Sequence, residues 1–163
     1  MSTQPAYPFI AFNFSVEINV PFVAQTLCNA AFSECDGLEM TMDVKTIREG
    51  GNNTRQIRLV GPASYGQVTL KRGMTRSFDL WDWFDAQQHA SPQQLRGNDI
   101  RGEAEVVMLA ADHKTEQARF KLKRCLITKL KAPALNARDG MVAIEEMQLT
   151  YESLELKRPQ GGS

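Results

Sequence analysis

The residues that could do chemistry gather first in IREGGNN, residues 47–53, where two glycines and two asparagines lie between charged flanks. A glycine-rich loop binds phosphate when its amides converge with a lysine and a hydroxyl, in the order strand, GxxxxGK[ST], helix. This stretch has no such lysine–hydroxyl pair, and the residues after it alternate like a strand. Glycine and asparagine tolerate positive φ, so we interpret Gly50 and Gly51 as positive-φ positions at the tip of a hairpin.

Other residue types that do chemistry are scattered. Neither of the two histidines has metal-ligand spacing, and Cys28 and Cys35 have no second cysteine pair to complete a zinc site. Glu145 and Glu146 could act as an acid–base pair, but adjacent strand residues point to opposite faces, which favours solvated charges. No nucleophile elbow and no HExxH motif is present. We therefore expect no catalytic residue, no metal site and no cofactor.

A run of cations from Arg119 to Lys131 contains no acidic residue. A single-strand nucleic-acid site would interleave exposed aromatic side chains with these cations, and this run lacks them. The alternative is a strand whose polar face meets water or an acidic strand. The C-terminal segment supplies acids for such pairing, namely Glu145, Glu146, Glu152 and Glu155.

Length, charge and cysteines set the broad class. The 163 residues suggest one domain, with an ordered core over about 9–156 and a flexible tail at 157–163. Lysine plus arginine equals aspartate plus glutamate at 19 each, which gives no global field to attract nucleic acid or anionic lipid. No signal peptide and no membrane-length apolar run is visible. We expect cytoplasmic folding with Cys28, Cys35 and Cys125 reduced, since their odd number argues against a closed disulfide framework.

Period-two alternation of apolar and polar residues predicts strands through most of the chain. Gly61 and Pro62 are expected to end the third strand, and a phase slip at Glu145 and Glu146 suggests a β-bulge. Residues 132–140 are expected to form a loop. The expected strands are 11–20, 38–47, 55–59, 68–72, 102–110, 117–126 and 141–156.

The segment SFDLWDWFDAQQ, residues 77–88, is instead typical of an amphipathic helix. Ser77 can cap it, and the acidic residues on its polar face lie near the end where the dipole favours negative charge. At 100° per residue the apolar side chains fall within an arc of about 160°. We expect these to anchor the helix: Leu80, Trp81, Trp83 and Phe84. The predicted fold is mainly β, two packed antiparallel sheets in a sandwich or open barrel, with one principal flanking helix.

Several motifs, in this order, resemble one family closely: AFNFSVEI, FSECDGLEM, TIREGGNN, LKRGMTRSFDLWDWF and LNARDGMVAIEEMQLTYESL. Together they are similar to the tail tube proteins of contractile phages and of phage-tail-like injection particles. The resemblance spans roughly residues 9–156.

The resemblance implies a structural protomer without catalytic residues. In the family, subunits form a hexameric ring whose inner sheets join into one β-barrel, and rings stack into a tube inside a contractile sheath. Implied partners are the sheath protein, baseplate and tail terminator proteins, and DNA or protein cargo in the lumen. Implied locations are the bacterial cytoplasm during assembly, then a virion tail or a released particle. The family's extended loop corresponds to Ile47, Arg48, Glu49, Gly50, Gly51, Asn52 and Asn53.

Three alternatives stay open at this point. The chain could serve a phage tail or a bacterial injection particle, or it could be a small non-catalytic adaptor or baseplate component that binds another tail protein. The cysteines could also close a disulfide, within or between subunits, once a released particle meets an oxidising environment.

Overall fold

The structure is a computed structural model, and it describes residues 7–22, 32–51 and 54–159. These residues form nine strands and two helices: β1 (Phe14–Asn19), β2 (Phe32–Asp36), β3 (Met40–Arg48), β4 (Gln56–Tyr65), β5 (Gln67–Gly73), α1 (Asp79–Gln88), α2 (Pro92–Arg96), β6 (Gly102–Leu109), β7 (Glu116–Lys131), β8 (Ile144–Thr150) and β9 (Ser153–Lys157).

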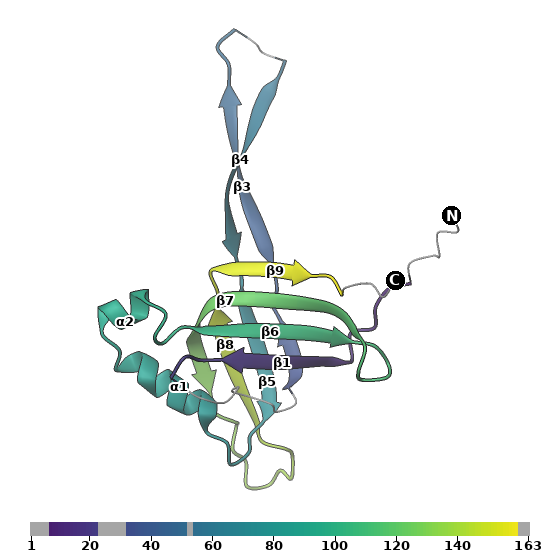
Figure 1. Ribbon diagram of the computed structural model, residues 1–163, viewed down its shortest axis with the longest axis vertical. Coiled ribbons are helices and arrows are strands. Elements are labelled where there is room, and N and C mark those ends of the chain that lie inside the picture. The colour runs from purple at the N-terminus through teal and green to yellow at the C-terminus, as the bar shows by residue number, and fades with distance from the viewer. Residues whose placement is uncertain (1–6, 23–31, 52–53, 160–163) are drawn as a thin grey trace.

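Seven strands fold into two layers that share β7, and every pairing is antiparallel (Figure 1). The first half of β7 pairs with β6 and β9, and β6 pairs with β1; we call these strands layer A. The second half of β7 pairs with β8, which continues to β5 and β2 as layer B. Arg124, with φ 56°, lies where β7 passes between the layers. The predicted mainly β fold with two antiparallel sheets is confirmed.

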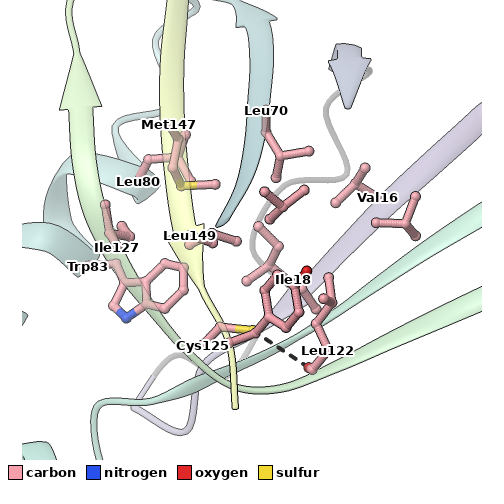
Figure 2. Packing of buried hydrophobic residues seen from close by; sticks show 14 of the residues in the cluster. Val16, Ile18, Leu70, Leu80, Trp83, Leu122, Cys125, Ile127, Met147 and Leu149 are labelled. Atoms are coloured by element: carbon pink, nitrogen blue, oxygen red, sulfur yellow. Dashed lines mark hydrogen bonds between the residues drawn. The ribbon is translucent and has the colours of Figure 1, made fainter. Parts of the chain in front are cut away.

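The core lies between the two layers (Figure 2). Alternation along each strand points one set of side chains inward, and α1 adds Leu80 and Trp83 at one end. The buried side chains at the centre include Val16, Ile18, Leu70, Leu122, Cys125, Ile127, Met147 and Leu149. This alternation is the pattern that the sequence showed, which is why the core strands could be located in advance.

β3 and β4 form a separate two-stranded hairpin that projects away from both layers (Figure 1). The prediction that Gly61 and Pro62 end the third expected strand, 55–59, is wrong, because the strand found there, β4, continues to Tyr65. Both residues lie opposite the single residue Asp43, where the register shifts between Met42 and Val44. Proline donates no ladder hydrogen bond and is tolerated at a bulge, so the pair kinks the strand without ending it.

The C-terminal segment also differs from its prediction. The expected single strand 141–156 is two strands, β8 in layer B and β9 in layer A, because the chain changes layer at Tyr151 and Glu152. The expected bulge is absent within β8, whose pairing with β5 runs without a shift from Ile144 to Thr150. Glu145 lies in the same phase as Met147 and is buried. The apparent slip was a charged residue at a core position.

The ends of the helices are set differently from the prediction. Ser77 does not cap α1: the N-cap is Phe78, without a side-chain cap bond, and Asp79 instead accepts from the amide of Leu80 at 2.9 Å. Ser91 is the N-cap of α2, a short helix that the sequence reading missed. Ser91 and Gln94 form a reciprocal capping box, with proline in the first turn.

Candidate assembly surfaces

The β3–β4 hairpin, the first candidate surface, exposes apolar side chains along its length. Val44 opposes Val60 and Met42 opposes Ala63 on one face, and their exposed fractions are 56% for Val44, 69% for Val60 and 63% for Met42. Nearer the tip, Ile47 and Ile57 oppose each other on the other face and are about equally exposed. A contiguous apolar surface of this kind marks an interaction site in a soluble protein.

The tip of the hairpin only partly follows the prediction. Gly51 has a left-handed φ of 96°, which favours glycine, but Gly50 does not, so the expectation of positive φ at both is wrong. A Cβ at either glycine would meet no atom within 4 Å. Ile47 and Arg48 end β3, Glu49 and the glycines follow as the turn, and the predicted Asn52 and Asn53 lie outside the described residues.

The four apolar residues of α1 meet the body of the protein unequally. Leu80 and Trp83 are fully buried, and the Trp83 indole donates to the carbonyl of Ile100 at 2.9 Å. Trp81 and Phe84 are half-buried, and the Trp81 indole donates to Glu145 Oε2 at 3.1 Å. Both indole nitrogens therefore donate to groups of the same subunit.

A buried charge cluster, which sequence reasoning missed, joins α1 to layer B. Arg72 and Glu145 oppose each other across β5 and β8, and their side chains are 2% and 1% exposed. Arg72 Nε donates to Glu145 Oε1 at 2.5 Å, and its Nη2 donates to Asp79 Oδ1 at 2.6 Å. A signal was present in the strand phase, because Arg72 lies on the same face of its strand as the buried Leu70, and Glu145 lies on the same face as the buried Met147.

The basic run of β7 pairs with acidic residues, as expected for a strand whose polar face meets an acidic strand. Arg124 contacts Glu152 at 2.6 Å, and Lys129 lies 3.9 Å from Glu146. Of the other predicted acids, Glu155 opposes Lys121 in the register, whereas Glu145 pairs with Arg72.

Glu105 of β6 is an acidic partner that the sequence reading did not name. It contacts Lys121 at 2.9 Å and also bonds Arg119. Burial opposes ionisation of this carboxyl, but hydrogen bonds from Lys121 and Arg119 outweigh it and hold its pKa below the usual value.

The thiols are poorly suited to nucleophilic chemistry. Burial is the main cause that raises the pKa of Cys35 to about 11 and that of Cys125 to about 12, so the reactive thiolate is scarce at neutral pH. Cys28 lies outside the described residues. The part of the chain that the structure describes contains no group of three or more side chains suited to hold a metal ion.

A hollow of about 650 Å³ lies near α2 and presents side chains that already bind one another. Arg101 contacts Glu152 at 2.9 Å, and Arg124 shares the same carboxylate. Among the described residues, no helix has the length and hydropathy to span a membrane.

Over residues 7–22, 32–51 and 54–159, the geometry is thus that of surfaces without an organised reactive centre, and comparison with known proteins agrees. The family model of the T4-like virus tail tube protein gp19 matches residues 10–155. The chain belongs to the T4-like tail tube family. Proteins of this family are structural, so this tail tube protein is not an enzyme, and its role is structural, in a tube.

Solved structures share the fold of this tail tube protein. It is similar to a chain of the anti-feeding prophage baseplate at a TM-score of 0.75 and 21% identity, covering 96% of this chain and 98% of that one. It is also similar to a chain of the sheath–tube complex of the PVC extracellular contractile injection system, in the extended state, at 0.74 and 17%, covering 94% and 93%. A chain of the PVC sheath/tube terminator gives 0.76 and 17%, covering 94% and 99%. A comparison with curated protein sequences finds no match.

Proposed function

We propose that copies of this chain form hexameric rings, and that the rings stack into the inner tube of a contractile tail or injection particle. The exposed apolar hairpin is the observation that carries this proposal. An isolated two-stranded hairpin is marginally stable in water, and this one exposes Met42, Val44 and Val60. Contact with a second copy, in the same ring or the adjacent one, would cover these side chains.

The remaining partners follow from the family and from the complexes in which its fold occurs. The similar chains come from an anti-feeding prophage baseplate, a PVC sheath–tube complex and a PVC sheath/tube terminator. For this protein we infer a sheath around the tube, a baseplate and a terminator at its ends, and DNA or protein cargo in its lumen. Contraction of the sheath would then drive the tube through a target envelope.

Sedimentation and electron microscopy of the purified full-length chain test the proposal directly. We expect rings or polydisperse tubes. The variant Val44→Asp with Val60→Asp should stay folded and lose assembly, because charge replaces the apolar patch without touching the core. Gln93→Asp on α2, an exposed site far from the hairpin, is the control and should assemble normally.

Two outcomes contradict the tube proposal. The first is a folded wild-type chain that stays monomeric over a wide concentration range, which would favour the adaptor or baseplate alternative. The second is a doubly charged hairpin variant that assembles as well as the wild type, which would remove the hairpin from the interface.

A further inference from the structure

The β3–β4 hairpin leaves the body of the protein through two short connections, one on each strand. Residues 37–39 lead from β2 into β3, and Gly66 joins β4 to β5. Gly37 has a φ of 101°, and a Cβ there would clash with the carbonyl oxygen of Gln67, so only glycine fits this departure from layer B. The Gly66 amide donates to the Glu39 carbonyl at 3.3 Å, which joins the two connections to each other.

The hydroxyl of Tyr151 bonds to the backbone at both ends of the first connection. It accepts from the Glu39 amide at 3.1 Å, and it lies 3.0 Å from the Gly37 carbonyl oxygen and 3.1 Å from that of Glu39, either of which can take its proton. One hydroxyl therefore contacts backbone groups on both sides of Leu38. Within the described residues, the side-chain hydrogen bonds that join the two layers to these connections all come from Tyr151.

Tyr151 is itself held firmly by the body of the protein. The residue is 4% exposed and belongs to the core, at the point where the chain passes from β8 to β9. The amide of the next residue, Glu152, donates to the carbonyl of Lys123 in β7 at 3.0 Å. Burial raises the pKa of the Tyr151 hydroxyl above its ordinary value, so the proton that it donates is retained at neutral pH. A fixed hydrogen-bonding group thus faces the base of a projecting element.

We propose that Tyr151 is a positioning residue for assembly, whose hydroxyl fixes the direction in which the β3–β4 hairpin projects from the layers. This role rests on the proposed contact of the hairpin with other copies, and it names the group that aims the hairpin. A hairpin that projects on two short connections can pivot about them (Figure 1). A copy whose hairpin points elsewhere cannot join, so the apparent affinity falls with the fraction of competent copies. The bonds of Tyr151 remove that cost before the copies meet.

Tyr151→Phe tests the proposal, because it keeps the buried ring and removes only the hydroxyl. The matched control is Tyr65→Phe at the end of β4. The Tyr65 ring lies 5.7 Å from that of Tyr151 between centroids, and its hydroxyl makes no hydrogen bond within the described residues.

The first measurement is the concentration at which the full-length chain forms rings or tubes. Tyr151→Phe should raise this concentration about tenfold, and Tyr65→Phe should leave it unchanged. Tubes that form above the raised concentration should have the wild-type diameter, because contact between copies then supplies the orientation. Assembly of Tyr151→Phe at the wild-type concentration overturns the positioning role.

Residual dipolar couplings measure the direction of the hairpin apart from assembly, in the full-length chain that carries Val44→Asp and Val60→Asp. With Tyr151 in place, one alignment tensor should fit the amides of the hairpin and of both layers. Adding Tyr151→Phe should shrink the hairpin couplings and leave those of the layers unchanged, which a general loss of stability would not do. A single tensor that still fits after Tyr151→Phe, or that fails to fit before it, overturns the proposal.

Amide exchange in the same assembly-deficient chain provides the test if Tyr151→Phe does not fold. Glu39 is exposed, yet its amide should exchange slowly because it donates to the Tyr151 hydroxyl. Exchange of the Glu39 amide at the rate of an open loop overturns the proposal.

The two proposals fail separately. A folded wild-type chain that forms no ring or tube overturns the tube function, whereas the dipolar couplings still decide whether Tyr151 aims the hairpin. Tubes at wild-type yield from Tyr151→Phe overturn only the positioning role.

Discussion

At the scale of single residues, Arg72 and Glu145 show how a charge can occupy a core position. The pair is almost fully desolvated, and Asp79 and the Trp81 indole satisfy further donors and acceptors of the cluster. A complete buried network of this kind tolerates substitution poorly, because the loss of one member leaves the others charged and without that partner.

Arg72→Met should therefore lower the free energy of unfolding by about 3–5 kcal/mol, the usual cost of leaving a buried charge without its partner. Urea denaturation at fixed protein concentration measures this. Lys71→Met is the matched control, since Lys71 pairs with Glu34 at the surface and exposed pairs contribute about 0–1 kcal/mol. The double variant Arg72→Met with Glu145→Met should recover much of the loss. Equal effects of Arg72→Met and Lys71→Met would contradict the cluster's importance.

Asp112 provides a pH-dependent contact in the turn between β6 and β7. Its carboxylate accepts the hydroxyl and amide of Thr115 and the amide of Lys114, and these bonds lower its pKa to about 2. Because the folded pKa is depressed, the stabilisation is present above the unfolded pKa near 3.8 and is lost as pH falls through about 2.

A carboxyl NMR titration of the assembly-deficient hairpin variant should find the pKa of Asp112 near 2. Thr115→Val removes the largest cause and should raise that pKa toward the ordinary value. An unchanged titration in Thr115→Val would show that the side-chain hydroxyl contributes nothing.

At the scale of elements, α1 depends on one tryptophan more than on the other. Trp83→Ala should cost about 3–5 kcal/mol of unfolding free energy, the range for a large buried aromatic. Trp81→Ala should cost less, because Trp81 is half-buried, so the substitution removes only partial packing and the hydrogen bond to Glu145. Chemical denaturation of both variants checks the order, and equal, negligible losses would refute the anchoring role of this helix.

The two glycines at the tip of the hairpin should likewise differ in how well they tolerate substitution. Gly51→Val forces a β-branched residue to a φ of 96° and should cost about 1–2 kcal/mol in the hairpin, reducing tube yield. Gly50→Val has neither a positive φ nor a close neighbour and should assemble nearly normally. Electron microscopy of both variants at matched concentration measures the yield. A greater loss of tube yield for Gly50→Val than for Gly51→Val would contradict the assignment of the strained position to Gly51.

These elements also show where sequence reasoning reaches and where it stops. Alternation located the core strands and the hairpin because burial on one face imposes period two on the residues themselves. It misread Glu145 as a bulge because the residue that makes its burial possible, Arg72, lies 73 positions away. It ended β4 at Gly61 because a bulge opposite Asp43 cannot be distinguished from a turn without the partner strand.

At the scale of the whole molecule, the candidate surfaces were less predictable than the fold. The assembly role of the hairpin loop entered through family resemblance, and the apolar sides of the hairpin became visible only when pairing fixed which residues share a face. The strands that lie at the edges of layer A are set by which strands find partners, and a glutamine of α1 covers an edge of layer B at β7. Both are properties of topology, which single residues do not report.

The continuity of β7 through both layers has a mechanical consequence. Its sixteen residues run unbroken from layer A to layer B, and the chain crosses back directly after β8, at Tyr151 and Glu152, to begin β9 at Ser153. A load on either layer therefore passes into the other along covalent backbone as well as through side-chain packing. Two sheets joined only by apolar contact can slide under shear, whereas these must bend together. In the wall of the tube that we propose, driven end-on by a contracting sheath, that continuity would resist buckling.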